Sequence, residues 1–456
     1  MKKILGIIVL GLLLSGNAYA NKNSFNKWLY DNGHYELVEK IEKEICKSLD
    51  KGDPKYNTNL CHLDFYKNNL DIKLYKGSWK VPYEQNPNRD TLIYYNYKNL
   101  FSHFNGDSNT YQFNRYEVKP NDKPYEFNFN KRKDKFLEKQ MQKKALLSYL
   151  YFQNNEILID EISPKNRFGD FVDNETKLRS NSVGKSMVSY VLGHAICEGY
   201  IEGIDSTINN WPAISNTLYE GQKIIDLLNM RAGDQKYVND RGIVKMSGFD
   251  TDIKSISNTM NMVFRNSKKS KSKYNYNQLV TYIIFNYILH KTGDDFQKIL
   301  NKTFQKAKIK NSIYFNKLKE QTKNGNASNM FFASRYDYLR IAKAIMEDYQ
   351  NDTCVGKYLK EIHERRIKKN VKDTNFEEPG YGSTSTYGGQ FHMDYPGLKN
   401  RVIFGMSGYG GQAILIDVEN SRIVVVNSIH YNNTKYKYNV KKLLIDPIKK
   451  GKWKNF

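Results

Sequence analysis

Two strand pairs stand at opposite ends of the region from residue 136 to residue 456, and helical patterns fill the sequence between them. The first pair is 146-LLSYLYFQNNEILIDEI-162, with its turn at Gln153-Asn154-Asn155, and the second joins 412-QAILIDVE-419 to 422-RIVVVNSI-429. Apolar and β-branched runs separated by short Asn and Ser clusters are typical of hairpins. The order predicts a mixed α/β (α+β) domain, in which both ends build one antiparallel sheet with flanking helices around a helical insertion.

Periodic apolar positions predict the helices of this domain. The insertion spans about residues 182–380, and its last long helix has Ser334 as an expected N-cap. Gly293 stands where a C-cap would end the helix expected at residues 277–293. The expected helices cover residues 136–145, 223–234, 277–293, 333–348 and 438–445.

The first twenty residues have the pattern of a secretory signal peptide. Lys2 and Lys3 precede an apolar run, and Ala18-Tyr19-Ala20 is a small-x-small cleavage site. The apolar run is shorter than a membrane-spanning helix, and no cysteine follows it for a lipid anchor. An uncleaved anchor is the alternative interpretation. We therefore expect cleavage after Ala20, a periplasmic or secreted protein, and no stable membrane anchor after cleavage.

Residues 21–135 form a polar, aromatic extension whose role the sequence does not reveal; it contains one amphipathic helix pattern at 35–46. The whole chain has 71 Lys+Arg against 48 Asp+Glu. This excess would attract the chain to anionic cell-envelope polymers or lipid surfaces. A general bias of the composition toward Lys, Asn and Tyr is the alternative explanation. The positive charge is spread along the chain, which favours this alternative. The export signal and the lack of a nucleic-acid module exclude nucleic acid as a partner.

The chain has four cysteines. Cys46 and Cys61 lie close together in sequence and are able to pair in an oxidising compartment. Cys197 lies in an apolar helix and is expected to be a buried small hydrophobe, and Cys354 has no evident partner. No spacing resembles a zinc site, so we expect neither a metal nor another cofactor.

The stretch 180-SNSVGKSMVSYVLGHAICEGYI-201 carries a lysine near the start of an apolar helix. Gly184-Lys185-Ser186 suggests a P-loop, but that motif needs a glycine at the position of Arg179. A Ser-His-Asp hydrolase would show G-x-S-x-G around Ser182, which this sequence lacks. His194 is therefore expected to be a packed helix residue and not a member of a triad.

Ser182 and Lys185 form a Ser-x-x-Lys pair, whose spacing places both side chains on one helix face. A serine at this end of a helix would be a nucleophile if a base took its proton. Lysine can be that base once burial lowers its pKa from about 10.4 toward ~7–8. The alternative interpretation is a serine that caps the helix and a lysine whose stem snorkels to solvent.

The residues around this pair resemble the class C β-lactamase-like serine hydrolases, and most of all the branch of the 6-aminohexanoate-dimer hydrolases and related esterases. That branch has a similar S-x-x-K-S motif, followed by an apolar helix and A-I-x-E-G-x-I. Ala232 stands where the family usually has serine. The resemblance extends over about residues 145–430, through the segments 149–161, 182–201, 225–234 and 332–347.

The resemblance implies a second motif, Tyr-x-Asn, before the helix that ends at Thr292-Gly293. The family's interval reaches Tyr276, which would relay a proton to the leaving group; Tyr274 is the competing candidate. The amide position of the motif falls on Gln278, or on Asn277 if the register slips.

The resemblance implies a third element, Lys-Thr-Gly or His-x-Gly. Its counterpart is 408-GYGGQ-412, with Tyr409 in place of the cation and Gly410 and Gly411 beside the substrate. The N–H of Gln412 would complete an oxyanion hole with the N–H of Ser182. A glycine bulge at a sheet edge is the alternative interpretation. The similar run 387-YGGQ-390 better resembles the strand before the active-site strand.

The resemblance implies a serine hydrolase that cleaves a small or peptide-like ester or amide through an acyl-enzyme on Ser182. Without a cation in the third element, we do not expect efficient hydrolysis of β-lactams. The rival functions are a penicillin-binding carboxypeptidase or β-lactamase, and a catalytically silent relative that binds a cell-wall or surface ligand. The substitutions at Ala232, Gln278 and Tyr409 keep the silent relative open.

Overall fold

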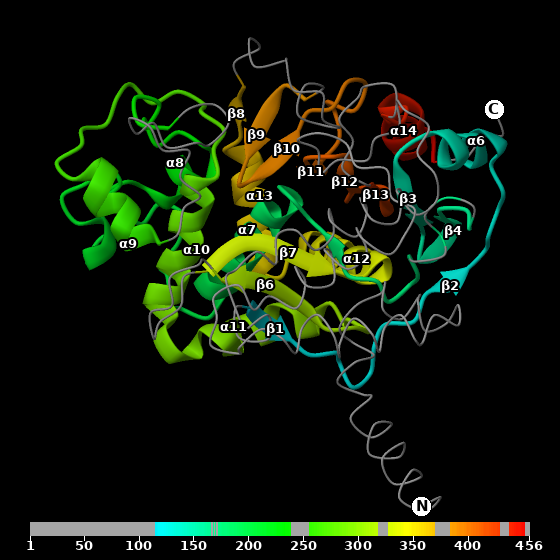
Figure 1. Cartoon of the computed structure of the whole chain (residues 1–456), viewed down its shortest axis with the longest axis horizontal. Helices are drawn as coiled ribbons and strands as arrows, with labels where there is room; N and C mark the ends of the chain where they lie inside the picture. The colour runs from blue at the N-terminus through cyan, green and yellow to red at the C-terminus, as the bar shows by residue number, and fades with distance from the viewer. Residues whose placement is uncertain are drawn as a thin grey trace, which may run out of the picture.

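The computed structural model describes residues 115–165, 167, 169, 172–238, 255–317, 327–369, 384–428 and 437–451 (Figure 1). Its strands are β1 (Arg115–Val118), β2 (Asn128–Phe129), β3 (Leu146–Gln153), β4 (Glu156–Ile162), β5 (Leu178–Arg179), β6 (Ile313–Lys317), β7 (Ala327–Ala333), β8 (Ile367–Lys368), β9 (Thr386–Gly388), β10 (Phe391–Met393), β11 (Ile403–Gly408), β12 (Gln412–Asp417) and β13 (Arg422–Ser428). Its α-helices are α6 (Lys135–Lys143), α7 (Val183–Cys197), α8 (Ile224–Leu228), α9 (Ile256–Thr259), α10 (Leu279–Thr292), α11 (Phe296–Lys306), α12 (Arg335–Gln350), α13 (Cys354–Glu364) and α14 (Asp446–Lys450).

The described strands form two sheets. The larger sheet has nine strands in the order β2-β4-β3-β13-β12-β11-β10-β9-β8, and the smaller has four in the order β1-β6-β7-β5. In the larger sheet β3 pairs with β13 in antiparallel register, with Leu150 opposite Val425. The two ends of the domain therefore meet in one sheet, which confirms the predicted fold class.

Both predicted hairpins form, and their turns have the backbone that their residues favour. Asn154 and Asn155 join β3 to β4 with φ of 49° and 65°, values in the left-handed region that asparagine tolerates better than most residues. Ser421, at the start of β13, likewise has a φ of 51°. The strand pairs of the larger sheet are antiparallel except for β2 with β4, which is parallel.

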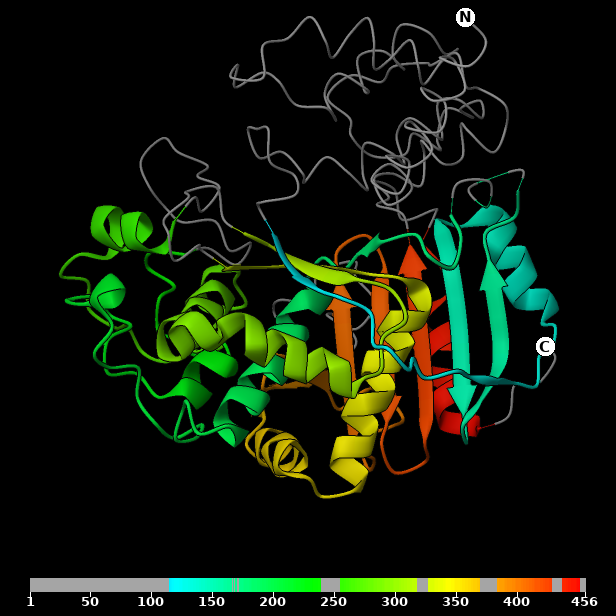
Figure 2. The ribbon, with the colours of Figure 1, turned by 90° about the horizontal axis from the view of Figure 1, so that it is seen from below.

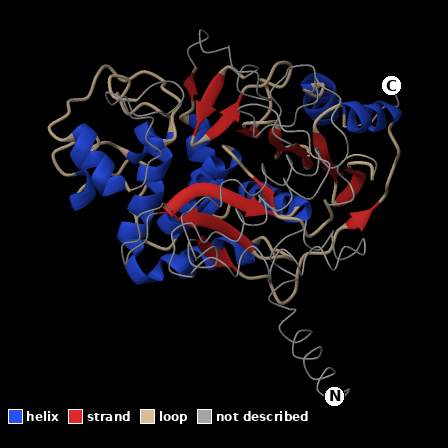
Figure 3. Ribbon diagram, viewed as in Figure 1, coloured by secondary structure: helices blue, strands red, loops and turns tan. Residues whose placement is uncertain are grey.

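Helices cover both faces of the larger sheet. One face packs against α7, α12 and α13 through side chains such as Met406 and Val425. The other face packs against α6 and α14 through side chains such as Tyr149 and Leu415. Figure 2 shows the helical middle, in green, beside the sheet, and Figure 3 shows most helices gathered at that end of the molecule.

The helices of the middle begin and end largely where the sequence indicates. The Ser334 side chain caps α12 by accepting a hydrogen bond from the N–H of Asp337. Gly293 follows α10 with a φ of 53°, in the left-handed region. The predicted helix at 438–445 is instead a π-helical turn, Lys441–Ile445, that continues into α14.

The segment just before residue 136 belongs to the folded domain. Strand β1 pairs with β6, and β2 pairs with β4. Residues 115–129, which the sequence pattern places in the N-terminal extension, therefore contribute strands to both sheets. The predicted signal peptide, the helix pattern at 35–46 and the pair Cys46–Cys61 lie outside the described residues. Among the residues that are described, no helix has the length and apolar character that crossing a membrane requires.

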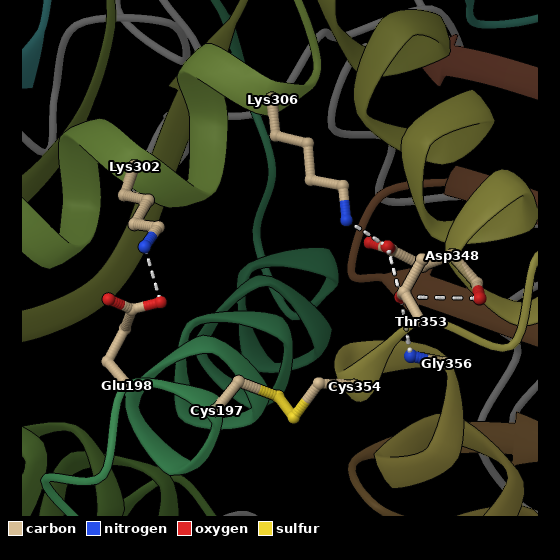
Figure 4. The surroundings of a disulfide bond; sticks show 8 residues. All are labelled: Cys197, Glu198, Lys302, Lys306, Asp348, Thr353, Cys354 and Gly356. Atoms are coloured by element: carbon tan, nitrogen blue, oxygen red, sulfur yellow. Dashed lines mark hydrogen bonds and ion pairs between the residues drawn. A yellow bond between two sulfur atoms is a disulfide. The ribbon is translucent and has the colours of Figure 1, made fainter.

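A disulfide bond joins Cys197, the last residue of α7, to Cys354, the first residue of α13, with the two Cα atoms 5.8 Å apart (Figure 4). The expectation of a buried, unpaired Cys197 and a partnerless Cys354 is therefore wrong. The two residues are 157 positions apart in sequence, and only the packing of α13 against α7 brings them together. The bond ties the end of the helix that follows Ser182 to the helix pair α12–α13.

Replacing both cysteines by serine should destabilise the folded domain. The disulfide closes a long loop, and removing such a cross-link typically lowers the free energy of unfolding by about 2–5 kcal/mol. Urea unfolding of wild type and of the Cys197→Ser/Cys354→Ser variant measures the difference. A reducing agent should shift the wild-type midpoint toward that of the variant and leave the variant unchanged. Equal midpoints for both proteins without reductant would contradict the prediction.

Candidate active site

Ser182 lies directly before the first residue of α7 and is available for chemistry. Its backbone already has helical dihedrals, φ −70° and ψ −7°, and its side chain makes no capping hydrogen bond. The first turn of α7 begins with the N–H groups of Val183 and Gly184 bonded to the carbonyls of Ser180 and Asn181. The alternative interpretation of Ser182 as a capping residue is therefore not what the structure shows.

Lys185 is buried, with only 2% of its surface exposed, so its stem does not snorkel to solvent. Its Nζ lies 3.2 Å from Ser182 Oγ. The same amine donates to Gln278 Oε1 and lies 5.0 Å from the centre of the Tyr276 ring. The Ser-x-x-Lys spacing thus produces a serine hydroxyl and a buried amine within hydrogen-bonding distance.

In the segment before α10, the two candidates for the amide position of the second motif have different partners. Asn277 is buried, and its Oδ1 accepts from the N–H of Val280 at 2.9 Å, so it caps the helix start. Gln278 instead turns its amide to Lys185. Both Tyr274 and Tyr276 pack against Tyr387, with ring centres 5.5 and 5.9 Å apart, and the ring of Tyr276 also lies beside the Lys185 amine. The structure therefore brings Tyr276 and Gln278, and not their neighbours, to the Ser182–Lys185 pair.

Asp234 holds this segment in place, a role that the sequence did not reveal. Its carboxylate is fully buried and accepts from Asn275 Nδ2 at 2.9 Å and Asn277 Nδ2 at 3.1 Å. Tyr219 Oη donates to the same carboxylate at 2.9 Å. Burial raises the pKa of Asp234, while these hydrogen bonds oppose the rise. Asp234 is the last residue of the segment 225–234, which resembles the family. That resemblance was the only feature of the sequence that pointed to Asp234.

The first residues of the third element, Gly408 and Tyr409, lie beside the two residues that precede Ser182. The carbonyl of Tyr409 accepts from Asn181 Nδ2, next to Ser182. At Gly408 an added Cβ would lie 2.4 Å from the carbonyl oxygen of Ser180, so only glycine fits. The ring of Tyr409 is 43% exposed. Contact with the start of α7 therefore comes from the end of β11 and the turn after it.

Gln412, whose N–H the sequence predicts as an oxyanion donor, is the first residue of β12. It faces Gly408 across the β11–β12 hairpin, and its side chain bonds to the backbone N–H and carbonyl of Ser428 on β13. Gly410 and Gly411, with φ of 83° and 95°, form the turn between them. Gly408, at the end of β11, lies directly against Ser180 and Asn181, and Gln412 lies across the hairpin from it.

However the third motif is aligned with residues 403–412, it has no cation, because these residues include no Lys, Arg or His. On the neighbouring strand β10, His392 lies with its ring centre 6.1 Å from that of Tyr276. Burial, together with the charge of Lys369, holds the pKa of His392 well below its ordinary value. A neutral imidazole therefore stands on that side of Tyr276.

Asn329, on β7, is a further residue of this site that no sequence motif marks. Its Oδ1 accepts from Gln278 Nε2, so it lies directly behind the amide that contacts Lys185. Elsewhere on α7, His194 is packed, with its ring centre 4.8 Å from that of Tyr190. Among the described residues, no group of three or more His, Cys, Asp or Glu side chains is arranged to hold a metal ion.

No protein-family model matches the sequence, and no curated protein matches it. Among solved structures, the chain is similar to a protein of Bacillus anthracis assigned as a 6-aminohexanoate-dimer hydrolase, with a TM-score of 0.54 and 12% identity over 78% of this chain and 92% of that one. It is also similar to EstCE1, a hydrolase with promiscuous acyltransferase activity, with a TM-score of 0.47 and 12% identity over 69% of this chain and 99% of that one. A penicillin-binding protein homologue from Pyrococcus abyssi gives a TM-score of 0.48 and 15% identity over 69% of this chain and 75% of that one. The first similarity confirms the predicted fold, which is β-lactamase/transpeptidase-like.

Replacing Gly184 by alanine should damage the site directly. The added Cβ would lie 1.9 Å from the carbonyl oxygen of Asn329, so β7 and the first turn of α7 must separate and move Lys185 from its partners. We expect a loss of at least tenfold in any turnover that depends on Ser182, together with a lower melting temperature. Gly203→Ala is the matched control, because nothing lies within 4 Å of its added Cβ. Equal behaviour of the two variants would contradict the prediction.

His194 should make the fold less stable in mild acid. Burial lowers its pKa from 6.5 to about 4, so the unfolded chain takes up a proton at a pH where the folded chain does not. Stability contributed by the neutral ring is present above pH 6.5 and is lost as the pH falls toward 4. Between pH 7 and pH 5 the loss is about 2 kcal/mol in the free energy of unfolding.

Urea unfolding at these two pH values checks this prediction with two variants. His194→Gln should reduce the pH dependence, whereas His290→Gln, at an exposed histidine on α10, should retain it. An unchanged pH dependence in His194→Gln would show that other groups cause the acid sensitivity.

Proposed function

We propose that the protein is an exported serine hydrolase that cleaves an ester or amide through an acyl-enzyme on Ser182. The observation that carries the proposal is a buried amine, Lys185 Nζ, 3.2 Å from a serine hydroxyl that caps no helix. Removing an amine from water favours its neutral form, which is the form that accepts a proton. The predicted signal peptide supports export to the periplasm or the medium.

The reaction begins when Ser182 Oγ attacks the substrate carbonyl and its proton passes to Lys185 Nζ. The C–O bond forms, and the carbonyl electron pair moves to the oxygen. Collapse of this intermediate breaks the bond to the leaving alcohol or amine, which takes its proton from Lys185 or through Tyr276. Water then attacks the acyl-enzyme, gives its proton to the same base, and releases the acid with Ser182 restored.

The oxyanion needs hydrogen-bond donors beside Ser182. The backbone N–H of Ser182 is one, at the N-terminal end of α7, where the helix dipole also favours negative charge. We assign the second donor to the N–H of Tyr409 instead of Gln412, since the backbone of Tyr409 lies beside Asn181. In this proposal Tyr409 takes the role that the sequence predicts for Gln412.

Residues 403–412 supply no cation, which favours ester and amide substrates over β-lactams with their invariant carboxylate. A penicillin-binding carboxypeptidase or β-lactamase would depend on such an anchor. A catalytically silent relative would have no use for the buried amine next to Ser182. The substrate class is therefore a small or peptide-like ester or amide outside the cytoplasm.

The proposal predicts a burst of p-nitrophenol from p-nitrophenyl esters and an acyl adduct on Ser182. Ser182→Ala should lose both, with turnover reduced by about a thousandfold or more, and Lys185→Met should slow acylation to a similar degree. Ser215→Ala is the control, because Ser215 is exposed and far along the chain from the site. Intact-mass measurement with ester, amide and β-lactam probes identifies the acyl group that remains.

Each alternative function has a distinct result in this experiment. A penicillin adduct that Ser182→Ala abolishes would establish the penicillin-binding carboxypeptidase or β-lactamase. Folded wild-type protein that neither ester nor fluorophosphonate labels would establish the silent binding relative. Unchanged ester turnover in Ser182→Ala would refute the assignment of the nucleophile.

A further inference from the structure

We propose that Asn329 is a positioning residue that orients the amide of Gln278, and that this amide in turn orients the amine of Lys185. The inference rests on the proposed function, because it concerns the same base. It extends the site to strand β7, where neither the motifs nor the comparisons assign a residue.

The contacts form one continuous line. Asn329 Oδ1 accepts from Gln278 Nε2, Gln278 Oε1 accepts from Lys185 Nζ, and Lys185 Nζ lies 3.2 Å from Ser182 Oγ. Asn329 and Lys185 are both at least 98% buried. Water therefore has little access to Asn329 and Lys185, the two groups that the partly buried Gln278 amide connects.

The direction of the Gln278 amide decides what Lys185 can do. With Oε1 toward the amine, a neutral Lys185 uses an N–H for Gln278 and keeps its lone pair for the proton of Ser182. If the amide were reversed, its NH₂ group would face the amine and occupy that lone pair. Because Asn329 offers its oxygen to Gln278 Nε2, the reversed amide would lose this bond. Asn329 thus favours the orientation in which Lys185 is a base.

The backbone around Asn329 is held on both sides, and this fixes the position of the Cα atom from which its side chain extends. Its carbonyl packs against the first turn of α7 at Gly184, where no Cβ fits. Two residues on, Phe331 exchanges hydrogen bonds with Ser180: its carbonyl accepts from the Ser180 N–H at 2.8 Å, and its N–H donates to Ser180 Oγ at 3.1 Å. At the strand start, the Asn286 side chain pairs with the backbone of Ala327. Strand β7 therefore transmits the position of α7 to Asn329.

Stability alone does not account for an asparagine at this position. Its Nδ2 is buried and has no hydrogen-bond partner among the described residues. A buried donor left without a partner is unfavourable, and an apolar residue of similar size would avoid that penalty. The oxygen of the same amide has a partner in Gln278. The residue is therefore explained by the acceptor that it supplies to the site.

Steady-state kinetics with a neutral p-nitrophenyl ester test the proposal in three variants. Asn329→Leu removes the acceptor and should lower kcat by about tenfold to a hundredfold with little change in KM. Asn329→Asp keeps an acceptor for Gln278 and should retain most of the activity at high pH. Its negative charge favours the ammonium form of Lys185, so the rising limb of the kcat/KM profile should move to higher pH by about one unit. Ser328→Ala, at the adjacent residue of β7, should behave as wild type.

A double-mutant cycle separates positioning from general damage to the fold. If Asn329 acts only through Gln278, then Asn329→Leu should have no further effect in a Gln278→Leu background. Additive losses, or wild-type kcat and pH profile in Asn329→Leu, would overturn the proposal. If Asn329→Leu fails to fold, as its melting temperature would show, the pH profile of Asn329→Asp decides alone, and an unshifted profile overturns the proposal.

The failure of this proposal differs from the failure of the proposed function. Wild-type protein that forms no acyl adduct on Ser182 would remove the function and the role of Asn329 together. An active wild type, an inactive Ser182→Ala variant and an unaffected Asn329→Leu variant would remove the role of Asn329 only.

Discussion

The antiparallel pairing of β3 with β13 is the constraint on which the other features depend. It joins the two ends of the domain, so the long helical middle must leave the sheet and return to it. The chain leaves through the segment before α7 and comes back through β7 and α12. Because α7 packs under β11 while β7 lies against its first turn, the start of α7 is enclosed from several sides. This enclosure removes Lys185 from water and leaves Ser182 at the helix start.

Features that depend on neighbouring residues could be predicted from the sequence, and those that depend on distant residues could not. The β3–β4 hairpin and the cap at Ser334 follow from local backbone preferences. Strand β11 was not expected, since Phe404-Gly405-Met406-Ser407-Gly408 lacks the β-branched pattern of β12 and β13. The Cys197–Cys354 bond depends on how α13 returns to α7, and no local pattern records that path.

The same distinction divides the candidate site. Ser182 and Lys185 are three residues apart on one helix, so their proximity is a local property that the spacing contains. Gln278 required a choice of register, which the burial of Asn277 as a helix cap decides. The place of Gln412 depends on the glycine turn that joins β11 to β12, and that turn is specified by the pairing of the two strands. Asn329 has no motif, and its place in the site arises from the packing of β7 against Gly184.

The chemistry of the enclosed groups argues against a site that is only a relic of the fold. A buried amine, a buried amide and a partly buried amide are unfavourable compared with apolar side chains of the same volume, unless every polar group is paired. Here the donors and acceptors of Lys185, Gln278 and Asn329 match in one direction, toward Ser182, while Asn329 Nδ2 lacks a partner among the described residues. A binding protein that had lost its chemistry could gain stability by replacing these groups with leucine or methionine. Under the proposed function, the presence of these groups together, with one donor unsatisfied, is explained by the proton that Ser182 would have to lose.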